Sequence, residues 1–407
     1  MQFNLLKDRL KKASPTKSTA DRENTASTGD GPMDLWLAGT AFALLIIGLV
    51  MVYSASAPIA ARNFGDATHF ALRNAVFALV GIISMVAISR LPVDSIRYLG
   101  RIGFWISLLL LVAVLIPGMG LEGGGARRWL NFRVITVQPS EPFKVMLALY
   151  TAHLIAQDAG MVHRIRDGIV YLLALFALGA ALLMAEPDFG ATVISAAVVF
   201  GIVFIAGIPL SWIATLLTIA VPLAAMAVIM APYRFRRVTS FLDPWDDPQN
   251  SDFQLVQSLL SFGNGGVFGT GLGQGEQKQF YLPESHTDFI FAVIGEEMGL
   301  GLVWLIIFLF AFLVWRAVQI ARFSTDPFVR LSTTGLTVLI GSQAVANMGV
   351  VMGLLPPKGL TLPLVSYGGS SLVITLSAIG LLLAFSRTVT LPDKPRTSTA
   401  NPREKAS

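Results

Sequence analysis

A carboxylate stands where a long apolar segment of this chain begins. The chain reads Tyr281-Leu-Pro-Glu-Ser-His-Thr-Asp288 and then continues into an apolar run that opens with Phe289-Ile-Phe-Ala-Val. An ionisable side chain at the mouth of a membrane helix is a candidate for chemistry on polar groups at the membrane surface. Position alone leaves two structural interpretations open: Asp288 as a first-turn acid favoured by the helix dipole, or Thr287 as the helix cap.

Two further acids, Glu296 and Glu297, follow on the same apolar run, where an unpaired acid is costly and is usually functional or paired. At about 100° per residue, Glu296 lies roughly 80° round the helix from Asp288, and Glu297 about 180°. The two acids therefore cannot both share the face of Asp288. We predict that they pair with another helix and do not act directly in catalysis.

Basic residues gather in two segments that we place on the outer side of a membrane. Of the 11 basic residues assigned to that side, eight lie in 120–144 and 231–287. These eight are Arg127, Arg128, Arg133, Lys144, Arg234, Arg236, Arg237 and Lys278. We expect an anion to bind there, with anchoring to lipid headgroups by snorkelling side chains as the alternative.

Three more polar segments fall at the ends of apolar runs on the same expected face. They are 138–144, 186–188 and 356–370, which contain Glu141, Glu186, Asp188, Lys358 and Ser366. Pro142 marks the start of a helix, so the ammonium of Lys144 should point toward the outer interface while its stem stays in apolar surroundings. Arginine, lysine and carboxylate groups are therefore expected to converge on this face.

Membrane-spanning helices must position these groups. Of the 407 residues, 54% are hydrophobic and 14% charged, and the mean hydropathy is +0.66, which is more apolar surface than one soluble core could use. A bilayer-spanning helix needs about 20 mostly apolar residues. We therefore predict an all-α polytopic membrane protein with ten transmembrane helices. The spans are 35–54, 71–89, 102–118, 142–157, 168–185, 190–206, 209–230, 288–315, 331–355 and 362–386.

An even number of spans puts both termini on one side. Placing the tails 1–33 and 388–407 in the cytoplasm, with Arg387 and the alternate loops, puts 19 of the 30 basic residues there. Lys and Arg accumulate in cytoplasmic loops, so both termini are predicted to be cytoplasmic and 34–387 to be the transmembrane domain. This orientation accounts for the net charge of +5 without a nucleic-acid partner. Residues 1–13 favour either a basic amphipathic helix on anionic lipid or disorder.

Cysteine and histidine usage narrows the chemistry further. With no cysteine, the chain has no disulfide, no thiolate nucleophile and no Cys-ligated metal. Its four histidines form no HExxH pair, which speaks against a histidine-built zinc site.

The stretch 231–287 is the one long segment between spans, and we expect it to be a large extracytoplasmic loop. It combines a basic opening (233–237), a turn-rich piece (242–248) and a glycine-rich run (263–275). The spacing of those glycines matches neither GxGxxG nor GxxxxGK[ST], so a nucleotide site is a poor interpretation. Flexible backbone lying close to a ligand or to the membrane surface is the better one.

Taken together, these segments resemble the SEDS family of cell-wall polymerases. The resemblance rests on GARRW, QPSEPFK, Tyr233-Arg-x-x-Arg237, FLDPWDDP, QLVQSL, FGNGGVFGTGLG, QKQFYLPESHTDFIFAVIGEE and MGLLPPKGLTLPLVSYGGSS, and it covers residues 34–387. Two segments, FLDPW and YLPESHTDFIFAVIGEE, are more similar to the division-specific members of the family than to the elongation members. The departures at Pro142, Phe143, Asp252 and Pro357 remove no charged group.

The resemblance implies a peptidoglycan glycosyltransferase that polymerises lipid II into glycan strands at the periplasmic face of the bacterial cytoplasmic membrane, at the division septum. The implied partners are a class B penicillin-binding protein that crosslinks the product, other division proteins of the membrane, and membrane lipids. Lipid II already carries a diphosphate leaving group, so no ATP is needed. The enzyme must deprotonate the acceptor hydroxyl, stabilise charge on the departing diphosphate and align two lipid-anchored substrates.

The resemblance also assigns roles to residues. Asp288 matches the family's essential aspartate and is expected to act as general base toward the 4-hydroxyl of the acceptor GlcNAc, in an inverting displacement. The candidates to hold the two diphosphates are Arg127, Arg128, Lys144, Arg234, Arg237 and Lys358. Supporting polar roles are expected for Glu141, His286, Glu296, Glu297 and Ser366. No cofactor is certain, but a divalent cation, Mg²⁺ or Mn²⁺, could share the diphosphate task, held by Asp288 itself.

Two other functions remain open at this point. A lipid II flippase would suit buried acids and outward basic clusters, but it needs a polar pathway through both leaflets. The cytoplasmic halves of the predicted spans hold few charges. A non-catalytic scaffold that recruits division proteins would still support division without Asp288.

Overall fold

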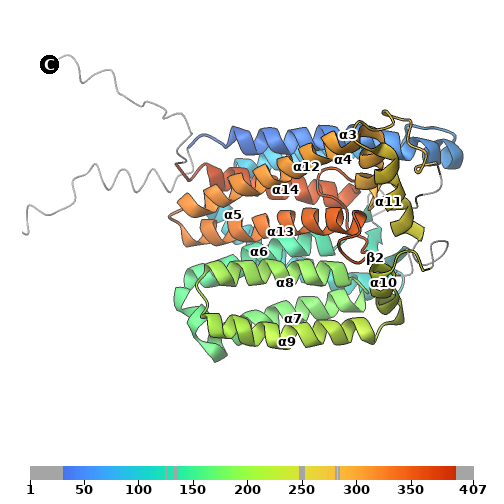
Figure 1. Cartoon of the computed structure of the whole chain (residues 1–407). Coiled ribbons are helices and arrows are strands. Elements are labelled where there is room, and N and C mark those ends of the chain that lie inside the picture. Colours follow the sequence, from blue (N-terminus) through green and yellow to red (C-terminus); the bar gives the residue numbers. More distant parts are fainter. Residues whose placement is uncertain are drawn as a thin grey trace, which may run out of the picture.

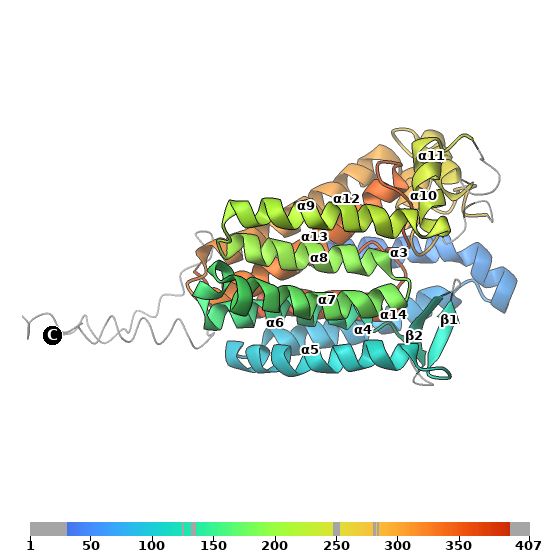
Figure 2. The same cartoon turned by 90° about the horizontal axis from the view of Figure 1, so that it is seen from below.

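Ten helices lie side by side in one bundle (Figures 1 and 2). The computed structural model describes residues 31–123, 126–131, 136–246, 253–279, 282 and 285–390, without the side chains of 122, 123, 126, 233, 234 and 240. The ten helices are α3 (Leu35–Phe64), α4 (His69–Ser89), α5 (Val93–Leu115), α6 (Ser140–Gln157), α7 (Val170–Ala185), α8 (Phe189–Ile205), α9 (Leu210–Ile229), α12 (Ile290–Phe323), α13 (Pro327–Val351) and α14 (Gly369–Ser386). Each corresponds to one of the predicted spans.

Eight of these helices are long and apolar enough to cross a membrane, counting α7 together with the short turn η2 (Ile165–Ile169) that precedes it. The other two are α8, which is apolar but shorter, and α6, which carries Glu141, Lys144 and His153. Helix α6 packs against α5, α8 and α13 and is buried along most of its length. Because protein surrounds it, its polar side chains are not exposed to lipid. The prediction of an all-α membrane protein is confirmed.

Several helices extend beyond the predicted spans. Helix α3 continues to Phe64 and α12 to Phe323, while α5 begins at Val93 instead of residue 102. Hydropathy ends a span where charges appear, but helical hydrogen bonding continues past them. In α5, Arg97 lies in the added turns and its Nη2 pairs with Asp326 Oδ2 at 3.2 Å.

The last predicted span, 362–386, is helical only from Gly369 onward. Residues 352–368 instead form a loop that returns into the bundle and buries Leu362, Leu364 and Val365. This loop crosses α3 at Gly48, where an added Cβ would lie 2.5 Å from the carbonyl oxygen of Leu364. Such a buried loop is tolerated in a membrane protein because protein satisfies its backbone groups.

The long segment 231–287 contains two helices that the sequence analysis did not predict, α10 (Pro232–Leu242) and α11 (Phe253–Gly265). Its glycine-rich run packs onto α12, which is interrupted at Gly299 (φ 67°, ψ −170°). The freed carbonyls of Glu296 and Glu297 accept backbone hydrogen bonds from Thr270 and Gly271, both at 2.9 Å. The backbone of this run therefore approaches α12, and its expected position close to a ligand or to the membrane surface stays a prediction.

The two ends of the bundle differ. A small antiparallel sheet of β1 (Gly120–Gly123), β2 (Ala126–Asn131) and β3 (Thr136–Val137) lies at one end, together with α10 and α11 (Figures 1 and 2). At the other end the described chain begins and finishes, where Gly31 N–H donates to the carbonyl of Arg387 at 3.2 Å. Asp34 joins them there: its carboxylate caps α3 and pairs with Arg316 at 2.8 Å.

Candidate active site

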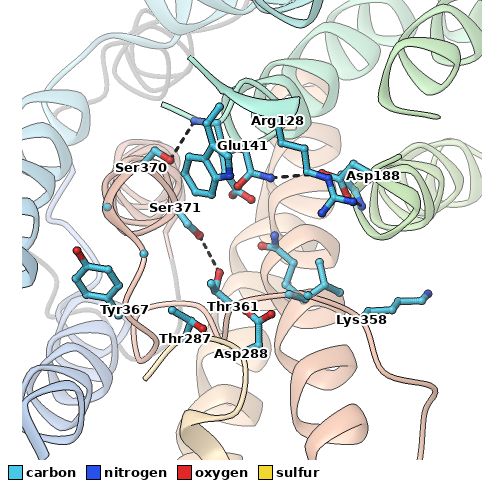
Figure 3. Close-up of a pocket in the computed structure, with 18 of the residues that line it drawn as sticks. Arg128, Glu141, Asp188, Thr287, Asp288, Lys358, Thr361, Tyr367, Ser370 and Ser371 are labelled. Atoms are coloured by element: carbon cyan, nitrogen blue, oxygen red, sulfur yellow. Dashed lines mark hydrogen bonds between the residues drawn. The ribbon is translucent and has the colours of Figure 1, made fainter. Parts of the chain in front are cut away.

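A cavity of about 700 Å³ opens at the end of the bundle that carries the sheet. Figure 3 shows Asp288, Thr287 and Thr361 on one side of it, with Arg128, Glu141 and Asp188 opposite. Its charged lining residues are Arg73, Arg128, Glu141, Lys144, Asp188, Arg237, Asp288 and Lys358. Its main polar and aromatic lining residues are Trp129, Gln138, Gln254, Thr287, Phe289, Gln343, Thr361, Tyr367, Ser370 and Ser371. The expected convergence of arginine, lysine and carboxylate groups is present here.

Asp288 reaches the cavity from the segment that precedes α12. The residue that caps α12 is Phe289, and no side chain makes a cap hydrogen bond there. Neither structural interpretation is therefore supported: the first turn of α12 contains no acid, which speaks against Asp288 as a first-turn acid, and Thr287 is not the helix cap. Gly359 passes close to the carboxylate, since a Cβ built on it would lie 3.1 Å from Asp288 Oδ2. The loop that carries Lys358 and the segment that carries Asp288 are thus in contact.

Three of the six predicted diphosphate-binding residues offer a cation to the cavity that is not paired with a carboxylate of the described chain: Arg128, Arg237 and Lys358. The guanidinium of Arg128 is oriented by the carbonyls of Glu186 and Pro187, at 3.1 and 2.7 Å.

Lys358 carries its charge in partly apolar surroundings. Its Nζ stands over the ring of Phe189, 5.1 Å from the centroid, and burial lowers the pKa of this ammonium. An anion in the cavity would stabilise the charged form and offset that cost. Arg237, an exposed residue of α10, reaches over the same loop, with its Nη1 3.5 Å from the carbonyl of Pro357.

The cation of Lys144 is already balanced by a carboxylate. Its Nζ donates to Glu141 Oε1 at 2.8 Å, and the lysine side chain is only 1% exposed. The two residues lie three apart on α6, so they meet on one face of the helix. Both line the cavity. The pair therefore forms a buried wall of the site, and a bound phosphate would have to compete with Glu141 for Lys144.

The other two predicted cations are placed differently. Arg127 precedes Arg128 on β2, where the pairing with β1 is irregular: Arg127 pairs with Glu122 and Trp129 with Leu121, so Arg128 is left out of the register. Arg128 lines the cavity and Arg127 does not, although Arg127 has a partner elsewhere. Arg234 belongs to α10, but its side chain lies outside the described part of the chain. Arg133 also lies outside the described residues.

The predicted supporting acids on α12 do not line the cavity. Glu297 accepts a hydrogen bond from Ser54 of α3 at 2.6 Å and pairs with Lys278 of the long loop at 2.6 Å. Glu296 accepts from the backbone N–H of Glu276 at 3.0 Å. The predicted pairing with another helix is confirmed for Glu297, through Ser54 of α3, whereas Glu296 binds the backbone of the long loop. They fix the loop and α3 against the first turns of α12.

His286 and Ser366 lie directly behind the cavity wall. His286 packs against Phe70 and Tyr367, with ring centroids 4.9 and 5.5 Å away. Ser366 Oγ donates to the carbonyl of Thr287 at 2.6 Å and accepts from Leu362 N–H at 2.8 Å. Both residues support the segment that ends in Asp288.

The acidic pair between α7 and α8 splits into two environments. Asp188 lines the cavity, caps α8 through Ala191 N–H at 3.0 Å and accepts from Gln138 Nε2 at 3.4 Å. Glu186 is 1% exposed, and neither of its carboxylate oxygens has a hydrogen-bond partner in the described chain. Burial, with a smaller contribution from Asp188, raises the pKa of Glu186 from 4.5 to about 8. Glu186 is therefore a neutral acid at pH 7.

Several residues of the site were missed from sequence. Arg73 lies near the start of α4 and lines the cavity, and Gln343 reaches it from α13. Asn347, one turn after Gln343, binds the carbonyl of Asp288. The spacing of Gln343 and Asn347 was a usable signal, because polar residues four apart on an apolar span share one face and usually serve a function.

The described residues contain no group of three or more His, Asp or Glu side chains arranged to hold a metal ion. A divalent cation at this site would therefore depend on oxygens of the substrate in addition to Asp288. Mg²⁺ commonly binds in that way, through one or two carboxylates and substrate phosphates. The donor set fits such a shared ion and does not fit a dedicated protein-held one.

The arrangement suits transfer chemistry on an anionic substrate. The carboxylate of Asp288 lines a space into which Arg128, Arg237 and Lys358 bring positive charge. A carboxylate can accept a proton, and arginine and lysine stabilise phosphate oxygens. Proton acceptor and anion site share one cavity.

Comparison with known proteins agrees with this geometry. A chain of Methylococcus capsulatus named probable peptidoglycan glycosyltransferase FtsW is 44% identical over 353 residues, which cover 86% of this chain and 89% of the relative. A protein of the same name from Alkalilimnicola ehrlichii is 45% identical over 354 residues, covering 86% and 88%.

Two solved structures are similar in fold. A chain from a peptidoglycan synthase complex, solved to study the coordination of polymerization and crosslinking, has a TM-score of 0.73 and 30% identity, and the match covers 87% of this chain and 98% of that one. The crystal structure of the rod shape determining protein RodA from Thermus thermophilus has a TM-score of 0.65 and 28% identity, with 88% and 98% covered. Residues 35–391 match the family described as cell cycle protein, FtsW/RodA/SpoVE. With the ten-helix bundle and the Asp288 cavity, this match places the chain in the FtsW/RodA/SpoVE family of membrane proteins.

Proposed function

We propose that this chain joins lipid II units into glycan strands for septal cell-wall synthesis, with Asp288 as the general base. The chain is an enzyme of the peptidoglycan glycosyltransferase class, the function that its relatives at 44% and 45% identity are named for. The observation that carries the residue assignment is the cavity itself, which Asp288 lines together with Arg128, Arg237 and Lys358. Figure 3 shows Asp288 and Arg128 on opposite sides of it.

The reaction needs one proton acceptor and one charged leaving-group site. Asp288 takes the proton of the 4-hydroxyl of the acceptor GlcNAc. At the same time the oxygen of that hydroxyl forms a bond to the anomeric carbon of the donor sugar. The bond from that carbon to the diphosphate oxygen breaks, and its electron pair leaves with undecaprenyl diphosphate. One carboxylate suffices for a single displacement with inversion, whereas a retaining route would need a second carboxylate as nucleophile. The other two carboxylates of the cavity are engaged by the protein, Glu141 by Lys144 and Asp188 by the first turn of α8.

The cations of the cavity hold the diphosphates. The guanidinium groups of Arg128 and Arg237 can form bidentate hydrogen bonds with phosphate oxygens, and the ammonium of Lys358 supplies a compact positive charge. The partial burial of Lys358 strengthens that interaction, since charges attract more strongly away from water. Asp288, together with oxygens of the substrate, would hold a divalent cation, Mg²⁺ or Mn²⁺, which would supply further positive charge for the diphosphate. Arg127, Arg234 and Lys144 remain secondary candidates, Lys144 because Glu141 already binds it.

The protein is a multi-span protein of the bacterial cytoplasmic membrane. We place both termini in the cytoplasm and the cavity at the periplasmic face. The ends of the described chain meet at the end of the bundle opposite the cavity, beside the basic residues Arg316 and Arg387, which supports this orientation. We further propose a class B penicillin-binding protein as partner at the division septum, together with other division proteins, because one solved relative belongs to a peptidoglycan synthase complex.

The test uses purified protein and lipid II in detergent, where no membrane separates two sides. We expect glycan strands from the wild-type protein and none from Asp288→Ala. A flippase would form no strands under these conditions, and a scaffold would give the same result with both proteins. Strand formation by Asp288→Ala at the wild-type rate would overturn the assignment of Asp288.

A further inference from the structure

Three consecutive backbone carbonyls lead up to the proposed base, and each accepts a hydrogen bond from outside its own segment. In residues 286–288, the first carbonyl accepts from Tyr367 N–H at 2.9 Å. The second accepts from Ser366 Oγ at 2.6 Å and the third from Asn347 Nδ2 at 2.8 Å. This segment is therefore held along its length by the re-entrant loop and by α13.

Of these three hydrogen bonds, the one from Asn347 is to the carbonyl of Asp288 itself, and the same nitrogen makes a second hydrogen bond. Its Nδ2 also donates to the carbonyl of Leu360 at 2.6 Å. The residue is only 2% exposed, so water does not compete for either hydrogen bond. One buried amide thus joins the residue that carries the base to a residue two positions after Lys358.

The side chain that joins two carbonyls must supply two donors from one compact, neutral group. The amide nitrogen of Asn347 has two N–H bonds, and both are used. An aspartate in its place would turn negative oxygens toward both carbonyls. An alanine would leave both carbonyls buried and without a donor. Asparagine is therefore the residue whose chemistry this position requires.

We propose that Asn347 is a positioning residue that holds Asp288 and Lys358 in one fixed relation, so that base and cation meet the same substrate. The loop is already tight at this point, because Leu360 N–H donates to the carbonyl of Lys358 at 2.9 Å. Between them, Gly359 approaches the Asp288 carboxylate. A misplacement of about 1 Å can cost on the order of 10²-fold in rate. This inference rests on the proposed function.

The chain offers a matched pair of serines for the test. Ser366 Oγ donates to the carbonyl of Thr287 at 2.6 Å, and Ser258 Oγ donates to the carbonyl of Val351 at 2.6 Å. Both serines are buried, but only Ser366 holds the segment that carries Asp288. Comparing Ser366→Ala with Ser258→Ala separates the loss of positioning from the loss of a buried hydrogen bond.

For the activity test, full-length variants are purified and assayed with lipid II in detergent. We expect Asn347→Ala to lower kcat about 10- to 100-fold while KM for lipid II changes less than about threefold. Ser366→Ala should also lower kcat, and Ser258→Ala should not.

The activity of Asn347→Asp relative to wild type should rise as the pH falls from 8 to 6, because a protonated carboxyl can again donate to one carbonyl. A purely structural role would not give that pH-dependent recovery.

A second measurement does not depend on catalysis. Amide hydrogen exchange in residues 359–367 should become faster in Asn347→Ala and Ser366→Ala but not in Ser258→Ala. If Asp288→Ala remained active while exchange changed as expected, the proposed function would fail and the positioning contacts would stand. The inference is overturned if Asn347→Ala keeps at least half of the wild-type kcat, or if Ser258→Ala loses as much activity as Ser366→Ala. Should Asn347→Ala fail to fold, Asn347→Asp and the two serine variants decide the question.

Discussion

Two acids on the same end of the bundle illustrate how surroundings assign chemistry to a residue type. Asp288 and Glu186 both precede a membrane helix. Asp288 lines a cavity whose described lining includes five cationic side chains, whereas Glu186 is buried with no hydrogen-bond partner for its carboxylate among the described residues. The first is placed to take a proton from a substrate. The second holds its own proton, since its pKa is raised to about 8.

Glu186 provides a prediction for stability against pH. Between pH 4.5 and about 8 the folded state keeps a proton on Glu186 that the unfolded state has released. Folding stability therefore falls as the pH rises through this window. Glu186→Gln has no such proton, so we expect it to stabilise the protein by a few kcal/mol (on the order of 1–4) at pH 8 and much less at pH 5. Melting temperatures in detergent at both pH values measure this difference.

An exposed acid serves as the control for that measurement. Glu276→Gln changes the same chemical group on the exposed loop, so its effect on the melting temperature should be small at both pH values. An equal gain in both variants, or a gain for Glu186→Gln that shrinks from pH 5 to pH 8, would contradict the buried neutral acid.

At the scale of elements, α12 combines two pieces with different tasks. Its first turns follow Asp288 and are fixed by Glu296 and Glu297, and the rest continues as a long span after the break at Gly299. The break frees carbonyls that the glycine-rich run binds. The long loop, α3 and the segment carrying Asp288 are thereby joined into one rigid support.

The break yields a prediction with its control on the same helix. An added Cβ at Gly299 would lie 2.4 Å from Gly269 N, in a left-handed conformation, whereas an added Cβ at Gly301 would meet nothing within 4 Å. We expect Gly299→Ala to destabilise the protein by about 2–4 kcal/mol and to reduce polymerisation. Gly301→Ala should be neutral or slightly stabilising. Thermal unfolding and strand synthesis in detergent measure both variants, and equal behaviour would refute the role of the break.

The elements also show what could be predicted from the sequence. The ten spans were found because each is a long apolar run, and that property is local. Helices α10 and α11 were missed because their apolar residues are interrupted by charge and turn signals. The start of the last span was wrong because residues 362–368 are as apolar as a helix would be. Apolar content reports burial, and backbone path depends on contacts such as that with Gly48.

The candidate site was predicted to the extent that its groups were charged and near span ends. Asp288, Arg128, Arg237 and Lys358 were found in that way, and all four line the cavity. The partners of Glu297 could not be predicted, because Ser54 lies 243 residues away and no spacing rule connects them. Arg128 differs from Arg127 because the pairing of β2 with β1 leaves Arg128 out of register, an irregularity that the sequence does not reveal.

At the scale of the whole molecule, the two ends of the bundle carry different structural features. One end gathers the ends of the described chain and the ion pair of Asp34 with Arg316. The other carries the sheet, the long loop and the cavity (Figures 1 and 2). A site confined to one end suits chemistry on a headgroup at one membrane surface. Transport would instead need a polar pathway through both leaflets.

This separation predicts a labelling pattern, and the absence of native cysteine makes it simple to measure. Asn63 is exposed in the last turn of α3 on the cavity side, and Thr325 is exposed between α12 and α13 on the other side. A membrane-impermeant maleimide should label Asn63→Cys in spheroplasts with intact inner membranes. It should label Thr325→Cys only after the inner membrane is opened. The reverse pattern would place the cavity in the cytoplasm and contradict the account.

The central claim is that Asp288 acts on the reacting hydroxyl while the neighbouring cations bind the substrate. The most direct measurement compares Asp288→Asn with the wild-type protein in detergent, recording both lipid II turnover and lipid II affinity. Loss of a general base typically costs about 10²–10⁴-fold in rate, while an amide of the same size leaves the cations in place. We expect turnover to fall at least about a hundredfold with Kd within about threefold of wild type. Turnover above a tenth of the wild-type rate, or a loss of affinity as large as the loss of turnover, would contradict the claim.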